Sequence, residues 1–441
     1  MILKAFKGGI HPSDKKEHTR YLKIEDLPAP KTMIFPLSQH IGALAEPVVK
    51  LGEWVKVGQL IAMATAFVSA NLHSSVSGTV IAIEPRMHPN GSLVNSIVIE
   101  NDDKYTVFEG VKPNKSLSEL TPQEIIKIVE KAGIVGMGGA AFPTHVKLSP
   151  PKDKKIDFLI INGAECEPYL TSDHRVMLEN PEGVLFGCTA IMKALGVTKS
   201  FVAVESNKDD AIKTLIENAK DFNGIEVVQV ETKYPQGSEK QLIDTVTGCK
   251  VPHGKLPADI GVIVVNIDTC AATANVIKTG MPLIQRIVTI GGGAINEFRN
   301  FRVRIGTPAK DVIDEVGGFK TEPAKILFGG PMMGIALFSL EAPVIKGTGA
   351  IIALTDKEAN IGKTGPCIRC AKCVDVCPMN LQPLMFQMLG KKDDLVALEN
   401  YNIFDCMECG ACAYICPARL DLVQYIRTGK QKINSSKKKG E

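Results

Sequence analysis

The 441-residue sequence has no long apolar run. Its most apolar stretch, GVIVVNIDTCAATANVI, is interrupted by Asn266 and Asp268, whereas a helix that crosses a membrane needs about 18 or more apolar residues in succession. The first residues, MILKAFKGGIHPSDKKEH, also lack the apolar core of a secretory signal peptide. We therefore expect a cytosolic protein, or one held at a membrane only through partners.

A large charge of one sign is also missing. The formal net charge is only +3, and a chain without a strong basic excess has no electrostatic reason to bind nucleic acid. We therefore expect no nucleic acid among its partners.

Cysteine is scarce outside one short region. Only Cys166, Cys188, Cys249 and Cys270 are scattered along the chain, while the other eight of the twelve cysteines lie between residues 367 and 416. Evenly spaced cysteines in a small secreted domain would indicate disulfides, but dense clustering in a long intracellular chain indicates bound metal. We expect the four scattered cysteines to be neither ligands nor disulfide partners.

The chain is too long for one hydrophobic core and changes character along its length. These changes predict a multidomain protein of the α/β plus α+β class. The predicted segments are an N-terminal extension at 1–30, a β domain at 31–110, an α/β domain at 111–254, a small α+β unit at 255–345 and a cysteine-rich domain at 346–441.

The α/β domain is predicted from alternating strands and helices, which indicate a mostly parallel sheet. Thr121 and Glu124 form the pattern of a capping box with Pro122 at the first helical position. Asn180 and Gly196 mark the ends of a second helix in the same way. Further elements are expected as strands at 156–161, 201–204 and 226–230 and as helices from about 209 and at 239–246.

The two cysteine runs have the same spacing, C-x2-C-x2-C-x3-C-P. A loop with two-residue gaps can hold three corners of a four-iron cluster, and the fourth thiolate then comes from the other run, because the chain has turned into a helix by that point. The spacing predicts two [4Fe–4S] clusters, and two structural zinc sites are the alternative. The expected ligands are Cys367, Cys370, Cys373 and Cys416 for the first cluster, and Cys406, Cys409, Cys412 and Cys377 for the second.

A glycine-rich segment, GIVGMGGAAFPTHVK, follows the first predicted helix of the α/β domain. Small residues let the backbone approach a planar or phosphorylated ligand, and Lys147 could pair with a phosphate. A helix rather than a strand precedes the segment, so it is not a dinucleotide fingerprint. A tight loop without a ligand is the alternative interpretation from these residues alone.

Four collinear segments resemble the flavoprotein subunit family of respiratory complex I. They are GMGGAAFPTHVK, NGAECEP, YPQGSE and VNIDT. The resemblance implies an α/β domain that binds FMN noncovalently and exchanges electrons with NAD(H). The positions that match FMN contacts are Gly136, Gly138, Gly139, Lys147, Asn162, Glu165, Gly237, Glu239 and Asn266, and those beside the nicotinamide are Phe142 and Glu167. Ala164, Ser238 and Val265 replace polar residues of that family, which puts the NAD(H) site in question.

The segments GEWVKVGQ and HSSVSGTV resemble a lipoyl-type domain, but no lysine lies between Lys56 and Lys104 to carry a lipoyl group. Together with FKGGIHP near the start, the order of the segments resembles the C-subunit family of Rnf electron-transport complexes over essentially the whole chain. This resemblance implies a lipoyl-like barrel-sandwich domain, an FMN domain, a β-grasp (SLBB-like) module and a double-cluster ferredoxin-like helical domain.

The same resemblance implies a peripheral subunit at the cytoplasmic face of the membrane. It would relay electrons between NAD(H) and FMN and through two clusters, in a ferredoxin:NAD oxidoreductase coupled to Na+ or H+ translocation. Its partners would be the iron–sulfur protein of the complex, the membrane subunits and, indirectly, ferredoxin. The alternatives are a soluble NADH-dependent reductase, such as a cobalamin reductase, and a relay scaffold that has lost its flavin. The sequence decides neither the ion nor the direction of electron flow.

Overall fold

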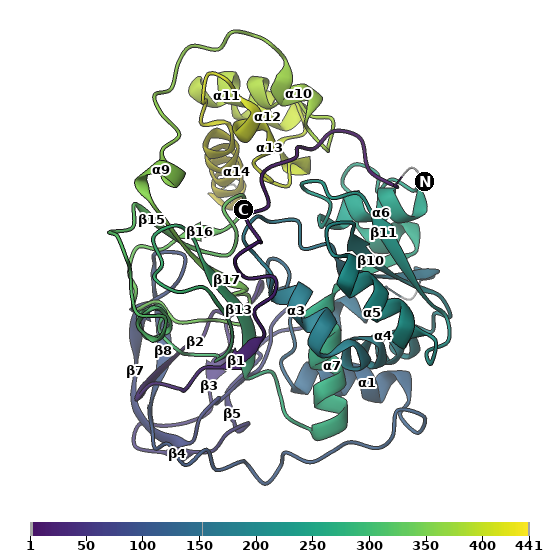
Figure 1. Cartoon of the computed structure of the whole chain (residues 1–441), viewed down its shortest axis with the longest axis vertical. Helices are drawn as coiled ribbons and strands as arrows, with labels where there is room; N and C mark the ends of the chain where they lie inside the picture. Colours follow the sequence, from purple (N-terminus) through teal and green to yellow (C-terminus); the bar gives the residue numbers. More distant parts are fainter. Residues whose placement is uncertain (1–2, 152, 440–441) are drawn as a thin grey trace.

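The computed structural model describes residues 3–151 and 153–439, and the chain forms three lobes (Figure 1). An α/β lobe lies on the right of that view, two β units share the left side, and a lobe of short helices sits above both. No helix of the described residues is long and apolar enough to cross a membrane.

The front β unit consists of two small antiparallel sheets, in the strand orders β2-β8-β7-β4 and β3-β5-β6. The long hairpin of β7 and β8 lies at the centre of the four-stranded sheet, and its residues Val80, Ile97 and Ile99 are fully buried. The strands are β2 (Thr32–Pro36), β3 (Glu46–Pro47), β4 (Trp54–Val55), β5 (Leu60–Met63), β6 (Leu72–His73), β7 (Gly78–Met87) and β8 (Leu93–Asn101). The expected barrel-sandwich fold without a helix is confirmed for this stretch.

The α/β lobe is built on a four-stranded parallel sheet in the order β11-β10-β9-β12. Its strands are β9 (Phe158–Gly163), β10 (Ser200–Glu205), β11 (Ile225–Val230) and β12 (Val262–Asn266). Its helices are α1 (Pro122–Lys131), α2 (Thr144–Lys147), α3 (Ser172–Glu179), α4 (Pro181–Leu195), α5 (Asp209–Ala219), α6 (Glu239–Thr247), η1 (Pro257–Ile260) and α7 (Ile267–Thr279). A side chain at Gly187 of α4 would overlap the Cys270 carbonyl of α7, so this glycine permits the close packing of the two helices.

The third unit is a six-stranded mixed sheet in the order β1-β14-β13-β17-β15-β16. Its core contains Val288, Ile290 and Ile351, and the helix α8 packs against it through Val312 and Ile313. The elements are β1 (Ile24–Asp26), β13 (Gln285–Gly291), β14 (Arg299–Arg304), α8 (Ala309–Glu315), β15 (Lys325–Phe328), β16 (Ile335–Ala336) and β17 (Ala350–Leu354).

Three predicted boundaries differ from this architecture. The α/β domain does not end at 254, because β12 pairs in parallel with β9 and α7 packs on α4. The α+β unit does not end at 345, because β17 pairs with both β13 and β15. The N-terminal extension is not separate either, because β1 pairs with β14. All three differences arise from strands whose partners are far away in the sequence.

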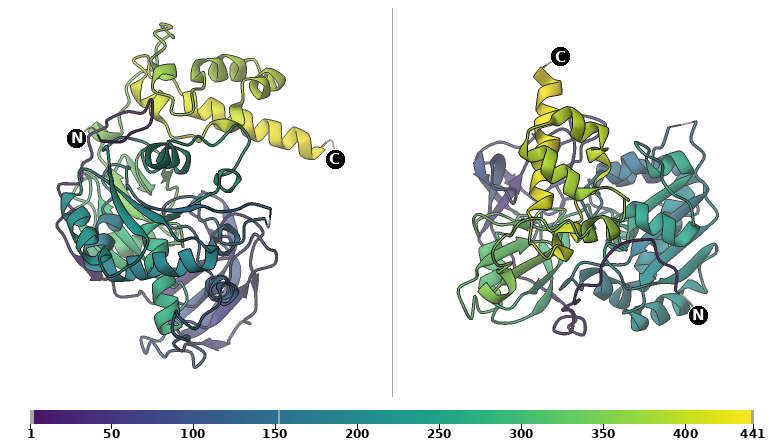
Figure 2. Two further views of the ribbon diagram at one scale, coloured as in Figure 1. Left: turned by 90° about the vertical axis from the view of Figure 1, so that its right-hand side faces the viewer. Right: turned by 90° about the horizontal axis from the view of Figure 1, so that it is seen from above.

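The helical lobe holds both cysteine runs. Its elements are α10 (Lys372–Asp375), α11 (Pro383–Lys391), α12 (Leu395–Asn400), η2 (Ile403–Asp405), α13 (Ala411–Ile415) and α14 (Leu422–Lys439), while the short helix α9 (Asp356–Ala359) before them packs on the six-stranded sheet. Phe386, Leu398 and Ile426 form a small core between α11, α12 and α14. In the side view of Figure 2, the end of α14 projects beyond the rest of the molecule.

Candidate functional site: a flavin loop and two cysteine cavities

The glycine-rich segment forms a closed loop between α1 and α2. Val135 bridges Pro143, and the Gly136 N–H donates to the Phe142 carbonyl at 2.8 Å. Within the described part of the chain, the N–H groups of Gly138 and Gly139 have no protein acceptor. A Cβ at Gly138 would lie 2.5 Å from the Asn266 Nδ2 atom, whereas no atom lies within 4 Å of one at Gly139. The loop therefore presents free backbone donors on an open side, which fits a phosphorylated planar group such as FMN.

Polar side chains gather where β9 and β12 end beside this loop. Asn162 and Asn266 are register partners on these strands, and ligands of open parallel sheets bind at such carboxyl ends. The Asn162 Nδ2 atom donates to the Gly237 carbonyl at 2.7 Å, and the Asn266 Nδ2 atom donates to Asp173 at 2.6 Å. Gly237 lies in the turn before α6. Three segments that match the flavoprotein family thus meet at one edge of the sheet.

A buried cluster of opposite charges surrounds Asp173 on α3. Burial, and next the nearby Glu165 and Asp268 carboxylates, raise the pKa of Asp173 to about 7. Lys16 is buried as well, and its Nζ atom donates to the Glu165 carbonyl at 2.8 Å and lies 3.6 Å from the Glu165 carboxylate. Burial lowers the pKa of Lys16. Arg286 of β13 forms an ion pair with Asp268.

Lys147 and Glu239, both expected at the FMN site, form an ion pair at 2.7 Å. The Lys147 Nζ atom also donates to the Val264 carbonyl of β12 at 3.1 Å. Both side chains are about one-third exposed, at 30% and 37%. The pair therefore joins α2 to α6 across the end of the sheet and remains accessible to a ligand.

Glu167, expected beside the nicotinamide, accepts two backbone hydrogen bonds. The donors are the N–H groups of Met332, at 3.0 Å, and Met333, at 2.8 Å. Burial raises the pKa of Glu167 to about 7, although both hydrogen bonds act in the opposite direction. The side chain of Phe142, the other residue expected there, is half-buried in the glycine-rich loop. Glu167 thus connects the α/β lobe with the turn that links β15 and β16.

The eight clustered cysteines line two separate cavities in the helical lobe. Cys367, Cys370, Cys373 and Cys416 line one cavity, which has about 380 Å³ of space free of protein atoms and is partly open to solvent. Cys377, Cys406, Cys409 and Cys412 line the other, of about 310 Å³. Among the described residues, no group of three or more His, Cys, Asp and Glu side chains has the arrangement of a single-ion site. Each cavity instead combines three thiols of one run with the last thiol of the other, as a pair of cubane clusters would require.

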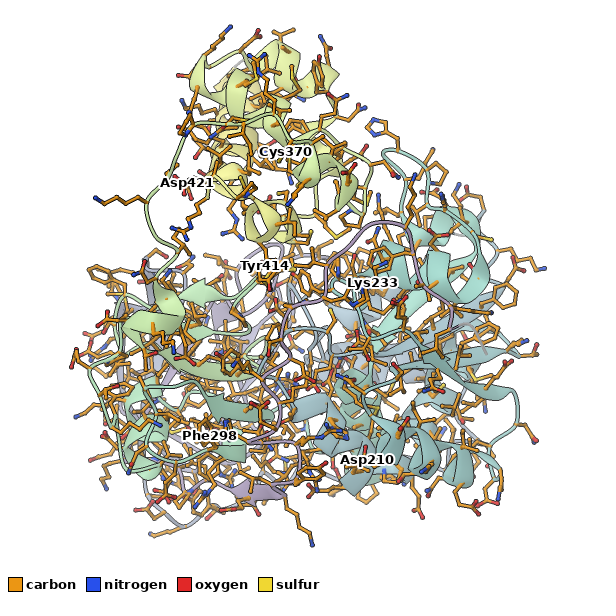
Figure 3. The ribbon with its side chains drawn as sticks, turned by 45° about the horizontal axis from the view of Figure 1, so that its top comes forward. Asp210, Lys233, Phe298, Cys370, Tyr414 and Asp421 are labelled. Carbon is orange, nitrogen blue, oxygen red and sulfur yellow. The ribbon has the colours of Figure 1, made fainter. Side chains whose placement is uncertain are left out.

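The two cavities differ in their exposure. Cys367 and Cys370 are exposed, whereas Cys377, Cys409 and Cys412 are buried. Burial raises the pKa of the Cys409 thiol to about 11, so this site would need the positive charge of bound iron to keep its thiolates. In Figure 3, Cys370 belongs to the upper lobe, and Tyr414 lies at the base of that lobe, toward the other lobes. We call the first cavity the outer cavity and the second the inner cavity.

The inner cavity lies against the α/β lobe. The Tyr234 hydroxyl donates to the Cys409 carbonyl at 2.7 Å, within a cluster of buried residues. Gln241 of α6 donates to the Pro378 carbonyl at 3.1 Å. The Gly9 N–H donates to the Val376 carbonyl at 2.8 Å. The residues around the inner cavity therefore contact both the α/β lobe and the N-terminal segment.

Several residues of this site are missing from the sequence predictions. Lys16, Asp173 and Arg286 all contact predicted site residues or their neighbours. Each lies outside the four matching segments. Lys16 and Asp173 stand in polar stretches, where a charged residue carries no sign that it will be buried, whereas the apolar residues around Arg286 are a signal in the sequence that could have indicated its burial. Tyr234 belongs to the matched segment YPQGSE, but nothing in the sequence indicates its contact with the second cysteine run.

Family models match every lobe of the chain. They are described as the RnfC barrel sandwich hybrid domain at residues 4–104, the Nuo51 FMN-binding domain at 129–275, the SLBB domain at 287–336 and the 4Fe–4S dicluster domain at 360–417. The FMN-binding match includes β12, and this agrees with the sheet order rather than with the boundary predicted at 254.

Two curated relatives are similar over almost their whole length. Both are C subunits of ferredoxin:NAD(+) oxidoreductase complexes. The one from the proton-translocating complex of Clostridium ljungdahlii is 52% identical over 97% of this chain and 93% of its own. The one from the Na(+)-translocating complex of Acetobacterium woodii is 48% identical over 99% and 98%.

A solved NAD+-reducing [NiFe]-hydrogenase shares the fold, with a TM-score of 0.51 and 18% identity over 71% of this chain and 61% of its own. With the order of its domains and its two long relatives, the chain belongs to the RnfC family, the C subunits of ion-translocating ferredoxin:NAD(+) oxidoreductase complexes.

Proposed function

We propose that this chain is the NAD(H)-exchanging flavin subunit of such a complex. The carrying observation is that the inner cysteine cavity lies directly against the α/β lobe, through the Tyr234 hydroxyl and the Cys409 carbonyl at 2.7 Å. The predicted flavin site and the cysteine sites thus belong to one packed unit. The relatives are named for ferredoxin:NAD(+) oxidoreduction with proton or Na(+) translocation, and we propose the same reaction for the complex of this chain.

FMN would bind noncovalently against Gly136–Gly139. The open N–H groups of the loop and the accessible Lys147 are suited to a phosphate, and Asn162, Glu165 and Asn266 supply polar contacts at the sheet edge. Gly237 and Glu239 close the site from the side of α6. Bound FMN would exchange electron pairs with the nicotinamide and single electrons with iron–sulfur clusters.

NAD(H) would approach Phe142 of the loop and Glu167, which follows β9. Glu167 is held by two backbone N–H groups, so its carboxylate has a fixed position. Ala164, Ser238 and Val265 supply no charge at the positions where the complex I family has polar side chains. A dinucleotide would therefore depend mostly on contacts with the backbone and with Glu167.

The inner cavity would hold one cluster and the outer cavity the other. This arrangement leaves Cys367 and Cys370 of the outer cavity exposed, where a partner protein can approach them. We propose that the iron–sulfur protein of the complex and the membrane subunits are the partners, at the cytoplasmic face of the membrane, and that ferredoxin acts through them.

The test is anaerobic purification followed by flavin, iron and zinc analysis and by NADH–dye turnover. We expect about one FMN and about eight irons per chain. Two zinc ions without iron would overturn the cluster assignment. Full cluster content without flavin, and without reduction by NADH, would overturn the flavin and NAD(H) roles.

A further inference from the structure

A buried arginine from outside the FMN-binding match reaches the flavin loop. Arg286 lies on β13, beyond the matched residues 129–275, and its side chain is only 2% exposed. Its guanidinium donates to the Met137 carbonyl of the loop at 3.1 Å and to the Thr348 carbonyl at 3.3 Å, and it forms an ion pair with Asp268 at the start of α7. One side chain therefore joins three segments around the loop.

Both backbone polar groups of Met137, its N–H and its carbonyl, form hydrogen bonds with side chains. Its N–H donates to the Thr269 hydroxyl at 3.1 Å, while its carbonyl accepts from Arg286. This fixes the backbone immediately before Gly138 and Gly139, whose N–H groups have no acceptor in the described part of the chain. The orientation of the open donors thus depends on the guanidinium.

The segment before β17 supports the same loop. A Cβ at Gly347 would lie 3.4 Å from the Ala141 Cβ and 3.8 Å from the Gly139 carbonyl. Lys346, which is fully buried, donates to the Gly133 carbonyl at 2.6 Å. The six-stranded sheet therefore forms one wall of the loop.

We propose that Arg286 is a positioning residue of the flavin site: its planar fork fixes the Met137 carbonyl, and its charge balances the carboxylates beside the loop. The facing charges are Glu165, Asp173 and Asp268 on the acidic side and Lys16 on the basic side. Lysine would supply the charge but not the planar donor geometry, because its ammonium is a compact point charge with freely rotating N–H groups. The inference rests on the proposed FMN site.

The test uses Arg286→Gln, Arg286→Lys and Asp268→Asn in the full chain, with Arg302→Gln as the control. Arg302 lies on the neighbouring strand β14 and pairs at the surface with Asp26, so it matches Arg286 in type and sheet but not in position. The readouts are the dissociation constant of FMN, the midpoint potential of bound flavin, and the circular dichroism spectrum as a measure of folding.

We expect Arg286→Gln to weaken FMN binding about ten- to a hundred-fold, as the loss of a charge-assisted contact does. It should also make the flavin potential more negative, because removing a positive charge from the site disfavours the reduced form of the flavin, which carries more negative charge. Asp268→Asn should shift the potential in the opposite direction. Arg286→Lys should restore the potential more than the affinity, and Arg302→Gln should change neither.

Unchanged affinity and potential in Arg286→Gln would overturn the inference. Shifts of the same sign in Arg286→Gln and Asp268→Asn would also overturn it, because they would indicate general damage to the fold. If Arg286→Gln does not fold, the lysine and Asp268→Asn variants carry the same test. A wild-type chain that binds no FMN would instead refute the proposed function itself.

Discussion

At the scale of single residues, Gly138 is a position in the flavin loop where an added side chain would have to displace Asn266. A Cβ there would lie 2.5 Å from the Asn266 Nδ2 atom, which donates a hydrogen bond to Asp173. We expect Gly138→Val to displace Asn266, to occupy the space of the ligand and to lower FMN occupancy at least ten-fold. Iron content should remain normal, because the cysteines lie in another lobe.

The measurement is the flavin-to-iron ratio in one preparation of the variant. Gly91→Ala is the matched control, because no atom lies within 4 Å of a Cβ at Gly91, which lies in the turn between β7 and β8 of the front β unit. Full flavin occupancy in Gly138→Val would contradict the site. Loss of iron together with flavin would show that the lobes do not fold independently.

Glu167 should make the stability of the chain depend on pH. Burial raises its pKa to about 7 from an ordinary value of 4.5. Between these values the folded chain holds a proton that the unfolded chain has released, so this group lowers stability as the pH rises from 4.5 to about 7. Glu167→Gln stays neutral and removes this dependence.

We therefore compare the melting temperature of Glu167→Gln with that of the wild type at two pH values. The variant should gain melting temperature relative to the wild type on going from pH 5 to pH 8. The difference should correspond to about 1–2 kcal/mol, after screening of a carboxylate that is only partly enclosed. Circular dichroism melts at both pH values provide the measurement, and Glu182→Gln on the surface of α4 is the control. An equal effect at both pH values would contradict the raised pKa.

At the scale of elements, the sequence predicts best where a local contact determines a boundary. The capping box of Thr121 and Glu124 starts α1, and the Asn180 cap and Gly196 in the left-handed region bound α4, as the pattern predicts. These signals act within four residues, so they can be read from the sequence without knowledge of the fold.

The elements that the sequence does not predict depend on distant partners. Helix α3 buries Ser172, Asp173, His174 and Arg175 together with two apolar residues, so its buried face looks polar in the sequence. The strands β12 and β17 fall outside the segments predicted for their units, because pairing with β9 and β13 is not encoded locally. For the same reason, cysteine spacing predicts two ligand sets, whereas nothing in the sequence indicates the contact between Tyr234 and the inner cavity.

At this scale, it can also be tested whether each cluster takes its fourth thiol from the other cysteine run. The Cys416 thiol follows α13 but lines the outer cavity with the first run, and Cys377 follows α10 but lines the inner cavity. We expect Cys416→Ala to lose about four of eight irons, with the same electron paramagnetic resonance spectrum as Cys373→Ala. Cys377→Ala should instead match Cys406→Ala.

Cys249→Ala is the control for these variants, because Cys249 is an exposed free thiol that belongs to neither run. It should retain all the iron. A Cys416→Ala spectrum that matches Cys406→Ala would assign all four thiols of each cluster to one run and would contradict the crossed arrangement.

At the scale of the whole molecule, electron transfer between lobes depends on how closely the helical lobe docks on the α/β lobe. Figure 1 shows the helical lobe above the junction of the other two, with the N-terminal segment running between them. Among the docking contacts, those of Tyr234, Gln241 and Gly9 each reach a carbonyl at or beside a cysteine, and an ion pair between His253 and Asp405 also joins the two lobes. A small change in this interface should therefore alter transfer without emptying either site.

Tyr234→Phe isolates one of these contacts. It removes the hydroxyl and leaves the buried Cys409 carbonyl without its partner, which costs about 1–3 kcal/mol. We expect normal flavin and iron content and an unchanged rate of flavin reduction by NADH, but several-fold slower reduction of the clusters. The lobes should stay together because the other contacts between them remain. Stopped-flow absorbance under anaerobic conditions separates the two rates.

Tyr169→Phe is the matched control, because the Tyr169 hydroxyl donates a hydrogen bond to Glu358 at 3.0 Å, away from both cavities. Equal rates of cluster reduction in the two variants would show that the Tyr234 contact does not control docking.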